Sequence, residues 1–324
     1  MLKRRTLLAA PALLAMPALA QANWPDRPLR MVIPFPPGGT TDILGRLLAQ
    51  HMGPRLGQTV VVENRGGAGG SLGAGDVAHA RPDGYSMLLS TNGSLTINPH
   101  VQANLPYDPF RQLAPLGLCL TVPMMIVVRA DHPAKTIQEL VTMSKARPGA
   151  TSMGSAGTGS SNHLAIELFS AATGAGVTHV PYRGSGPMIA DLLGGNVNSM
   201  CDQITTSLPM MRDGKVRALA ITDNHRSRLA PDVPTLVEAG FPEAEMVTFM
   251  GLSATAPVPP EALAKLVPAM QGALTEAIFH DRLETQGAEI VRGPLCTPAG
   301  YGAFLRTDFD KMKRAVTLAG IKPE

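Results

Sequence analysis

Short apolar runs alternate with amphipathic stretches in the first part of the chain. Residues 29–35 form an apolar run that predicts a strand, and residues 41–56 carry apolar side chains at helical spacing. Further strands are predicted at 60–62 and 86–90, with a helix at 71–80 between them. This alternation of strand and helix indicates a parallel sheet flanked by helices.

The same alternation restarts after an apolar run at 124–128. Thr136 and Glu139 form a capping box, which predicts the start of another helix. Beyond residue 250 the pattern is mainly helical. The predicted strands lie at 151–154, 177–181, 197–201, 216–222 and 251–256, and the predicted helices lie at 161–173, 185–194, roughly 260–286 and 298–319.

Two series of alternating elements predict an α/β protein with two lobes, each a mostly parallel sheet flanked by helices. The chain has 324 residues, which is long enough for two such units. We assign residues 23–124 and 251–324 to lobe 1 and residues 125–250 to lobe 2. The chain then crosses between the lobes near residues 124 and 250, and the two crossing strands form a hinge.

The first 22 residues combine a basic start, an apolar stretch and a small-residue end, which is the pattern of a cleavable signal peptide. The apolar run at 6–20 is too short for a membrane anchor and is interrupted by two prolines. Arg4 and Arg5 fit twin-arginine export, although paired arginines also occur in ordinary Sec signals. We therefore expect the protein in the periplasm and leave the export route open.

Removing the signal peptide takes away three basic residues and no acidic one, which reduces 28 basic residues to 25 against 25 acidic residues. A near-neutral chain with 4% aromatic residues has no basic, aromatic surface for nucleic acid, so no nucleic-acid partner is expected. Three widely spaced cysteines, Cys119, Cys201 and Cys296, favour buried thiols over a zinc cluster, and one disulfide in an oxidising compartment stays open. No metal and no cofactor is expected.

Two glycine-rich loops fall where a predicted strand meets a predicted helix, and ligands of open α/β sheets bind at such strand ends. Glycines allow close backbone approach, and the free N–H groups of a helix start attract anions. Two such loops facing each other would hold one carboxylate from both lobes. The alternatives are plain helix capping for the first loop and a flexible connector for the second. The candidate residues are Phe35, Gly38, Gly39, Thr40, Thr41 and Asp42 in the first loop, and Gly154, Ser155, Gly157, Thr158, Gly159, Ser160 and His163 in the second. For His163 a structural role is favoured over a titrating one.

Other candidate residues lie at neighbouring strand ends. Thr91 and Asn92 offer small hydrogen-bonding groups on the first lobe. Arg183 could pair with a second ligand carboxylate, and Tyr182 could stack on the ligand or donate its hydroxyl, but a plain surface position for the arginine is equally open. Asp202 could contact a ligand amine or hydroxyl, or accept backbone N–H groups instead.

Residues 69–73 match the Gly-x-Ser-x-Gly nucleophile elbow, with Ser71 as nucleophile and with acids and His280 following in the right order. The preceding predicted strand ends several residues before this turn, so a secreted serine hydrolase is the disfavoured alternative. The chain contains no P-loop, no Gly-x-Gly-x-x-Gly fingerprint and no His-Glu-x-x-His motif. We therefore interpret the protein as a binding protein and not as an enzyme.

Five short motifs are spread over the chain after the signal peptide: PFPPGGTTD at 34–42, VVENRGGAGG at 61–70, PDGY at 82–85, PYRG at 181–184 and PDVPT at 231–235. Together they resemble the Bug receptors, the extracytoplasmic solute-binding proteins of tripartite tricarboxylate transporters. Pro36 and Pro37 stand where alanines are frequent in that family, and Cys201 stands where an aromatic residue often precedes the aspartate. These departures leave the ligand open.

The resemblance implies a two-lobe periplasmic binding fold of the type II-like class, holding a small carboxylate between residues 35–42 and 154–163 without catalysis. It implies delivery of that ligand to integral membrane transporter subunits, with binding on behalf of a sensor or regulatory partner as the alternative. Ligands of similar proteins include dicarboxylates, citrate, acidic amino acids and aromatic acids. We expect a monomer.

Overall fold

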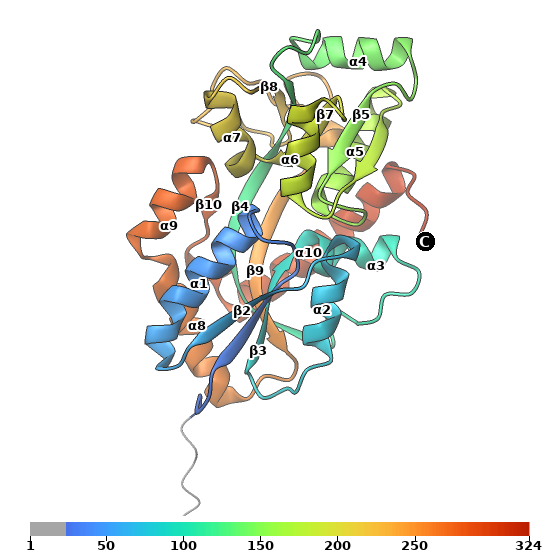
Figure 1. Ribbon diagram of the computed structural model, residues 1–324. Helices are drawn as coiled ribbons and strands as arrows, with labels where there is room; N and C mark the ends of the chain where they lie inside the picture. The colour runs from blue at the N-terminus through green and yellow to red at the C-terminus, as the bar shows by residue number, and fades with distance from the viewer. Residues whose placement is uncertain (1–23, 324) are drawn as a thin grey trace, which may run out of the picture.

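The computed structural model describes residues 24–323, so the predicted signal peptide lies outside the described residues. Two groups of elements, one above the other in Figure 1, are joined by two long strands. The lower group begins with β1 (Leu29–Ile33), α1 (Thr40–Leu56), β2 (Val60–Asn64), a short 3-10 turn (Ala68–Gly70), α2 (Ser71–Ala78), β3 (Ser86–Thr91), a π-helical turn (Gly93–Ile97) and α3 (Asn98–Val101). It ends with α8 (Pro260–Leu274), α9 (Ala277–Arg282), β10 (Glu289–Ile290) and α10 (Pro298–Leu318).

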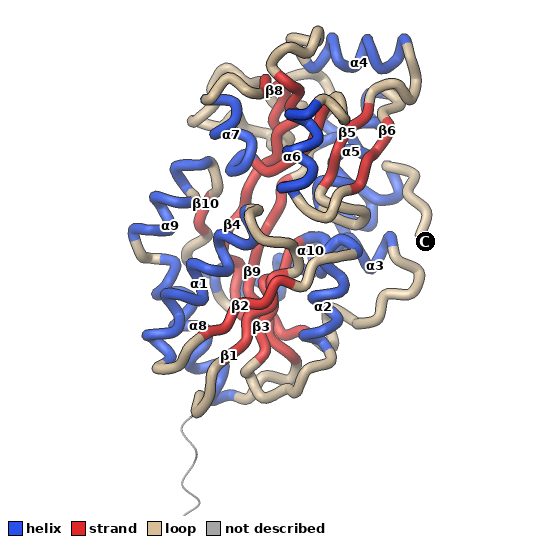
Figure 2. The backbone as a smooth tube through the Cα atoms, viewed as in Figure 1, coloured by secondary structure: helices blue, strands red, loops and turns tan. Residues whose placement is uncertain are grey.

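The upper group repeats the pattern of strand and helix, and the two long strands run between the groups (Figure 2). The long strands are β4 (Leu113–Arg129) and β9 (Val247–Thr255). The upper group consists of α4 (Ile137–Ala146), β5 (Ser152–Ser155), α5 (Ser161–Thr173), β6 (Thr178–Pro181), α6 (Ser185–Gly194), β7 (Ser199–Gln203), α7 (Ile204–Arg212) and β8 (Val216–Ile221).

The strand pairings confirm the predicted α/β class. In the first lobe β1 pairs in parallel with both β2 and β3, and in the second lobe β5 pairs in parallel with both β6 and β7. The antiparallel pairs all involve the long strands, because β9 runs against β3 and β4, and β4 runs against β7, β8 and β10. The carboxyl ends of the parallel strands therefore face the gap between the lobes.

The prediction missed most of β4, since only 124–128 stood out as a strand. Pro115, Gly117 and Pro123 lie inside the strand and interrupt its apolar pattern. The register against β9 shifts between Pro115 and Gly117, where a β-bulge accommodates the break. The predicted helix at 260–286 is divided between α8 and α9, and α7 was not predicted.

The lobe boundaries proposed from the sequence need refinement where β9 begins. Strand β4 pairs with β9 as far as Pro123 and with β7 from Met124, which fits a crossing near residue 124. Residues Val247 to Met250 already pair with the first-lobe half of β4, so the return crossing belongs before residue 247. The other lobe boundaries remain as predicted from the sequence.

The end of α10 also departs from its proposed place in lobe 1. Its side chains Met312 and Val316 are buried in the same apolar cluster as Phe169 of α5 and Leu140 of α4. The amphipathic face of α10 thus reaches across to the second lobe, and its start packs on the first through Tyr301. Sequence periodicity identified the helix but could not show that its two ends contact different lobes.

The described residues contain no helix long and apolar enough to cross a membrane. The three cysteines are buried free thiols. Burial raises the pKa of Cys119, Cys201 and Cys296, so these thiols are poor nucleophiles and poor metal ligands at neutral pH.

Candidate functional site

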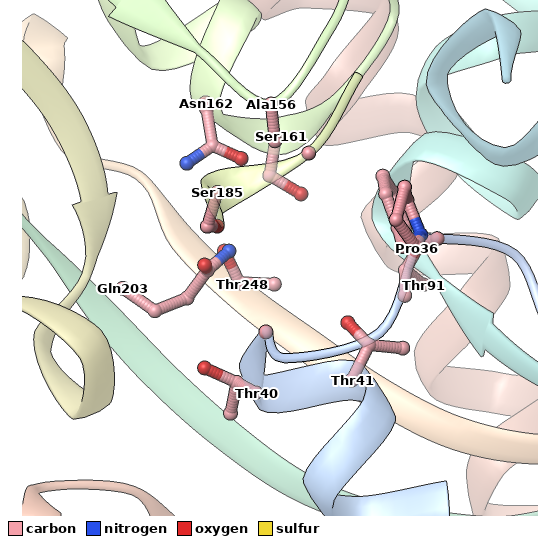
Figure 3. Close-up of a pocket in the computed structure, with 13 residues that line it drawn as sticks. Pro36, Thr40, Thr41, Thr91, Ala156, Ser161, Asn162, Ser185, Gln203 and Thr248 are labelled. Carbon is pink, nitrogen blue, oxygen red and sulfur yellow. The ribbon is translucent and has the colours of Figure 1, made fainter. Parts of the chain in front are cut away.

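A pocket lies between the two lobes at the carboxyl ends of the parallel strands (Figure 3). The space around it that protein atoms do not fill is about 430 Å³, which includes open solvent. The first lobe contributes Phe35, Pro36, Gly39, Thr40, Thr41, Thr91 and Thr248, and the second contributes Ala156, Ser161, Asn162, Gly184, Ser185 and Gln203.

The start of α1 forms the first-lobe wall of the pocket. The amides of Thr40 and Thr41 occupy its first turn and have no acceptor within the helix. Asp42 lies outside the pocket lining and instead holds the loop, because its carboxylate accepts hydrogen bonds from the amide of Gly38 and from the side chains of Arg46 and Asn64. Burial opposes ionisation of Asp42, but these donors together lower the pKa of its carboxyl below the ordinary value.

The starts of α5 and α6 form the second-lobe wall. Ser160 caps α5 by accepting from the amide of His163, which leaves the amides of Ser161 and Asn162 free in the first turn. Helix α6 begins after Gly184, whose φ of 106° favours glycine, and presents Ser185. Three helix starts thus point positive dipole ends into one pocket, an arrangement that binds anions through backbone amides.

Within the part of the chain that the structure describes, no arginine, lysine or histidine lines this pocket. A negative ligand would therefore be neutralised by helix dipoles and amide groups alone. Such groups have fixed positions and do not titrate, so their attraction for an anion is independent of pH.

Asp202 lies directly behind the second-lobe wall and is completely buried. Its Oδ1 accepts from Asn162 Nδ2 at 3.0 Å and from Ser185 Oγ at 3.1 Å. Burial raises the pKa of this carboxyl, although the hydrogen bonds from Thr206, Ser185, the Gln203 amide and Asn162 oppose the rise. Asp202 does not line the pocket; it orients the side chains that do.

Two buried hydroxyls of the first-lobe wall have no hydrogen-bond partner. Thr91 Oγ1 and Thr248 Oγ1 are both inaccessible to solvent, and each residue is 2% exposed. An unpaired buried hydroxyl costs about 1–3 kcal/mol, so it is expected to meet a ligand or an ordered water. Both residues belong to the pocket lining, so a polar group bound in the pocket can form hydrogen bonds with these hydroxyls.

The lobes contact each other beside the pocket. Gly69 and Gly93 of the first lobe pack against the backbone of Gly159, since a Cβ on Gly69 would lie 2.4 Å from the carbonyl carbon of Gly159. Ser161 Oγ donates to Asn92 Oδ1 at 3.3 Å, which connects the start of α5 to the first lobe. The structure is therefore closed around the pocket.

Several predicted residues line a second, outer hollow rather than the inner pocket. This hollow shares Phe35, Pro36 and Ala156 with the pocket and is also lined by Gly157, Thr158, Tyr182 and Arg183. Arg183 is exposed there, while the hydroxyl of Tyr182 donates to Asp191 at 2.8 Å. The expected contact between Arg183 and the far end of a ligand thus requires a guest long enough to extend into the outer hollow.

His163 does not line the inner pocket but a third hollow, which Glu167 and His179 also line. Burial lowers the pKa of His163 to about 4 and the pKa of His179 to about 4, so both rings are neutral at pH 7. One ligand atom from each of the three side chains lies within 4.8 Å of the others. The amide of Gly159 donates to His163 Nδ1, however, so Nε2 carries the ring proton on the side of Glu167, which opposes metal ligation.

The remaining predicted residues of the second loop shape it without lining the inner pocket. Gly154 allows the close approach of Met188 and Tyr182, and Ser155 Oγ accepts from the amide of Gly157. None of the second-lobe lining residues was among the candidates named from the sequence, and neither were Pro36 and Thr248 of the first lobe. The second-lobe lining residues are Ala156, Ser161, Asn162, Gly184, Ser185 and Gln203. Ser161, Asn162 and Ser185 occupy first helical turns, so the anion argument from helix starts could have included them.

The nucleophile-elbow alternative finds no support in the geometry. Ser71 is 2% exposed and its hydroxyl donates to the carbonyl of Ala68. His280 lies on α9 and pairs with Glu284, and Figure 1 places α9 and α2 on opposite sides of the first lobe. No serine–histidine pair is therefore formed by these residues.

Comparisons with known proteins agree on one family. The family model described as the tripartite tricarboxylate transporter family receptor matches residues 44–314. The protein BugT of Bordetella pertussis is 34% identical over 317 residues, which cover 98% of this chain and 96% of that protein.

Solved structures give the same result. The periplasmic binding protein BugD is 37% identical with a TM-score of 0.88, covering 93% of this chain and 100% of that one. Rpa4515 of R. palustris with adipate is 32% identical with a TM-score of 0.87, covering 93% and 100%. MatC from Rhodopseudomonas palustris with bound malate is 32% identical with a TM-score of 0.87, covering 90% and 100%.

Proposed function

The chain belongs to the tripartite tricarboxylate transporter receptor family of periplasmic solute-binding proteins, and we propose that it captures a small carboxylate between its lobes for delivery to membrane transporter subunits. The observation that carries the proposal is the convergence of three helix starts on one pocket without a basic side chain. The malate and adipate carried by two structural relatives support the same chemical class.

Closure of the lobes follows from the position of the pocket. The amides of α1 belong to one lobe, and those of α5 and α6 belong to the other, so one anion binds all three only when the lobes are close. A ligand that binds the closed state more tightly shifts the equilibrium toward it. The bound anion therefore connects the two lobes and stabilises the closed form, which is the form that the transporter would recognise.

A thermal-shift screen of mono-, di- and tricarboxylates, amino acids and aromatic acids tests the proposal on protein without residues 1–22. Ligand at a hundred times its dissociation constant adds about 2.7 kcal/mol of stability, which corresponds to a rise in Tm of about 5–10 °C for a protein of this size. If no acid in the screen raises the Tm, carboxylate capture is refuted.

Delivery to a transporter needs a separate experiment. Deleting the gene should reduce uptake of the identified acid by whole cells, and the chain without residues 1–22 supplied in the periplasm by another signal peptide should restore it. Binding in vitro together with unchanged uptake would instead support the sensor alternative.

A further inference from the structure

Three side chains on the second-lobe wall of the pocket, those of Ser161, Asn162 and Ser185, offer hydrogen-bond acceptors. The backbone of that wall offers donors, and the side-chain amide of Gln203, which also lines it, offers both. We propose that the guest carries, on the carbon next to its carboxylate, a hydrogen-bond donor such as an ammonium or hydroxyl group that meets Asn162, Ser161 and Ser185. This inference rests on the proposed capture of a carboxylate and narrows its chemical class.

The amide of Asn162 is oriented by its neighbours. Its Nδ2 donates to the carbonyl oxygen of Cys201 at 2.8 Å and to Asp202 Oδ1 at 3.0 Å. A backbone carbonyl can only accept, so the nitrogen must lie on that side and cannot be exchanged with the oxygen. Both N–H groups are then used, and Oδ1 lies on the side of Ser161 as an acceptor (Figure 3).

The hydroxyl of Ser185 is oriented by the same carboxyl group. Its Oγ lies 3.1 Å from Asp202 Oδ1, which also accepts from Asn162. The oxygens of an ionised carboxylate can only accept, and Oδ2 accepts from Thr206 Oγ1 at 2.8 Å. Ser185 therefore donates its hydrogen to Asp202, and its lone pairs remain for the pocket.

The hydroxyl of Ser161 has the same polarity for a different reason. Asn92 Oδ1 accepts from the amide of Phe249 at 2.8 Å, which fixes that atom as the oxygen. Ser161 must therefore donate its hydrogen to Asn92 across the gap between the lobes, at 3.3 Å. The side-chain oxygens of Ser161, Asn162 and Ser185 thus present lone pairs to the guest.

The amides and the acceptors belong to the same residues, which places the two ligand groups close together. Ser161, Asn162 and Ser185 offer backbone N–H groups to a carboxylate and side-chain oxygens to a donor. A donor on the carbon adjacent to the carboxylate fits this spacing. A keto oxygen in that position would face lone pairs, and a plain methylene would leave the acceptors unpaired.

Isothermal titration at pH 7 with matched acids tests this polarity. The series are propionate, lactate, pyruvate and alanine; succinate, malate and aspartate; and glutarate, 2-hydroxyglutarate, 2-oxoglutarate and glutamate. In the series that binds, we expect the hydroxy or amino acid to bind at least about 5-fold tighter than its plain or keto counterpart, because a site with unpaired acceptors rejects analogues that lack the donor. A smaller ratio, or tighter binding of the keto acid, overturns the inference.

The failure of this inference can be distinguished from failure of the proposed function. If plain or keto acids bind equally well, carboxylate capture stands and the donor requirement is refuted. If no member of the three series binds but a carboxylate without an adjacent hydroxyl or amino group raises the Tm in the wider screen, the donor requirement is refuted in the same way. If no carboxylate of any kind binds, both fail.

Two variants test the residues themselves. Ser185→Ala should reduce the donor preference at least about 3-fold. Ser199→Ala removes a buried hydroxyl on β7 that donates to Ser152 O outside the pocket, and it should leave the preference unchanged. An unchanged preference in Ser185→Ala, or an equal loss in the control, removes Ser185 from the role.

Asp202→Asn distinguishes the two kinds of donor. The amide oxygen can still accept from Asn162 and Ser185, and the amide nitrogen can donate to Thr206, so the polarity is kept while the charge is removed. A larger loss for the amino acid than for the hydroxy acid identifies an ammonium group, and an equal effect identifies a hydroxyl group. Loss of the donor preference itself would overturn the inference, since the polarity is retained.

Discussion

Gly69 should control whether the two lobes can close. Its φ of 61° lies in the left-handed region, and a Cβ there would lie 2.4 Å from the carbonyl carbon of Gly159 and 2.7 Å from its oxygen. Both neighbours are backbone atoms of the second lobe and cannot rotate away. We therefore expect Gly69→Ala to hold the lobes apart without disrupting either lobe.

The magnitude has two parts. A left-handed conformation costs alanine roughly 1–2 kcal/mol wherever it occurs. Overpacking typically adds 1–3 kcal/mol, but here only in the closed state, which corresponds to a roughly 5- to 150-fold fall in the ratio of closed to open molecules. The apparent dissociation constant of a ligand that needs the closed state should rise by the same factor.

Gly57→Ala provides the matched control, because it separates conformational strain from the lobe contact. Gly57 ends α1 with a φ of 69°, and a Cβ there would meet nothing within 4 Å. Both variants should lose similar stability in denaturant unfolding, but only Gly69→Ala should lose affinity by titration and lose ligand-induced compaction in small-angle scattering. If Gly69→Ala binds its ligand as tightly as Gly57→Ala, the closure argument is refuted.

Three further predictions concern other parts of the molecule. Arg183→Ala should weaken ligands with two acidic ends about tenfold and leave monocarboxylates unchanged, and equal losses measured by titration would place Arg183 outside the site. Because burial lowers the pKa of His163 to about 4, the unfolded chain takes up a proton below about pH 6.5 that the native state does not. The contribution of His163 to the unfolding free energy should therefore fall between pH 6.5 and 4 by an amount on the order of 3 kcal/mol, which the raised pKa of Glu167 partly offsets. Because burial also lowers the pKa of His179 to about 4, that ring contributes in the same direction, and His163→Gln should reduce the pH dependence in urea titrations without abolishing it. Asp42→Ala should release the loop at Gly38 and cost about 1–3 kcal/mol in ligand affinity, with a loss of stability alone arguing against its role in positioning α1.

The first-lobe half of the site could be predicted from the sequence because neighbouring residues along the chain specify it. A strand followed by two glycines and a helix start at Thr40 places free amides at a sheet edge, and this follows from backbone chemistry alone. The structure places Phe35, Gly39, Thr40, Thr41 and Thr91 in the pocket lining, as the sequence suggested.

The second-lobe half could be predicted only in part, because both the glycine-rich loop and the helix starts that follow it were possible ligand sites. The long Gly/Ser loop at 151–163 drew attention to its glycines, yet Gly157, Thr158 and Gly159 shape the outer hollows and the contact with Gly69. The pocket is instead lined by the first turns that follow. A sequence shows which residues can start a helix but not the direction in which that helix points.

The sequence by itself determined the α/β class, the order of most strands and helices, and the use of helix starts as anion sites, because hydrophobic periodicity and helix capping depend only on neighbours along the chain. The tertiary structure alone decided which oxygens face the guest. Asn162 and Ser185 present acceptors because Asp202, 40 and 17 residues away along the chain, accepts their hydrogens, together with the carbonyl of Cys201 in the case of Asn162. Hydrogen-bond polarity depends on the partner across space, and the local pattern of residues does not contain that partner.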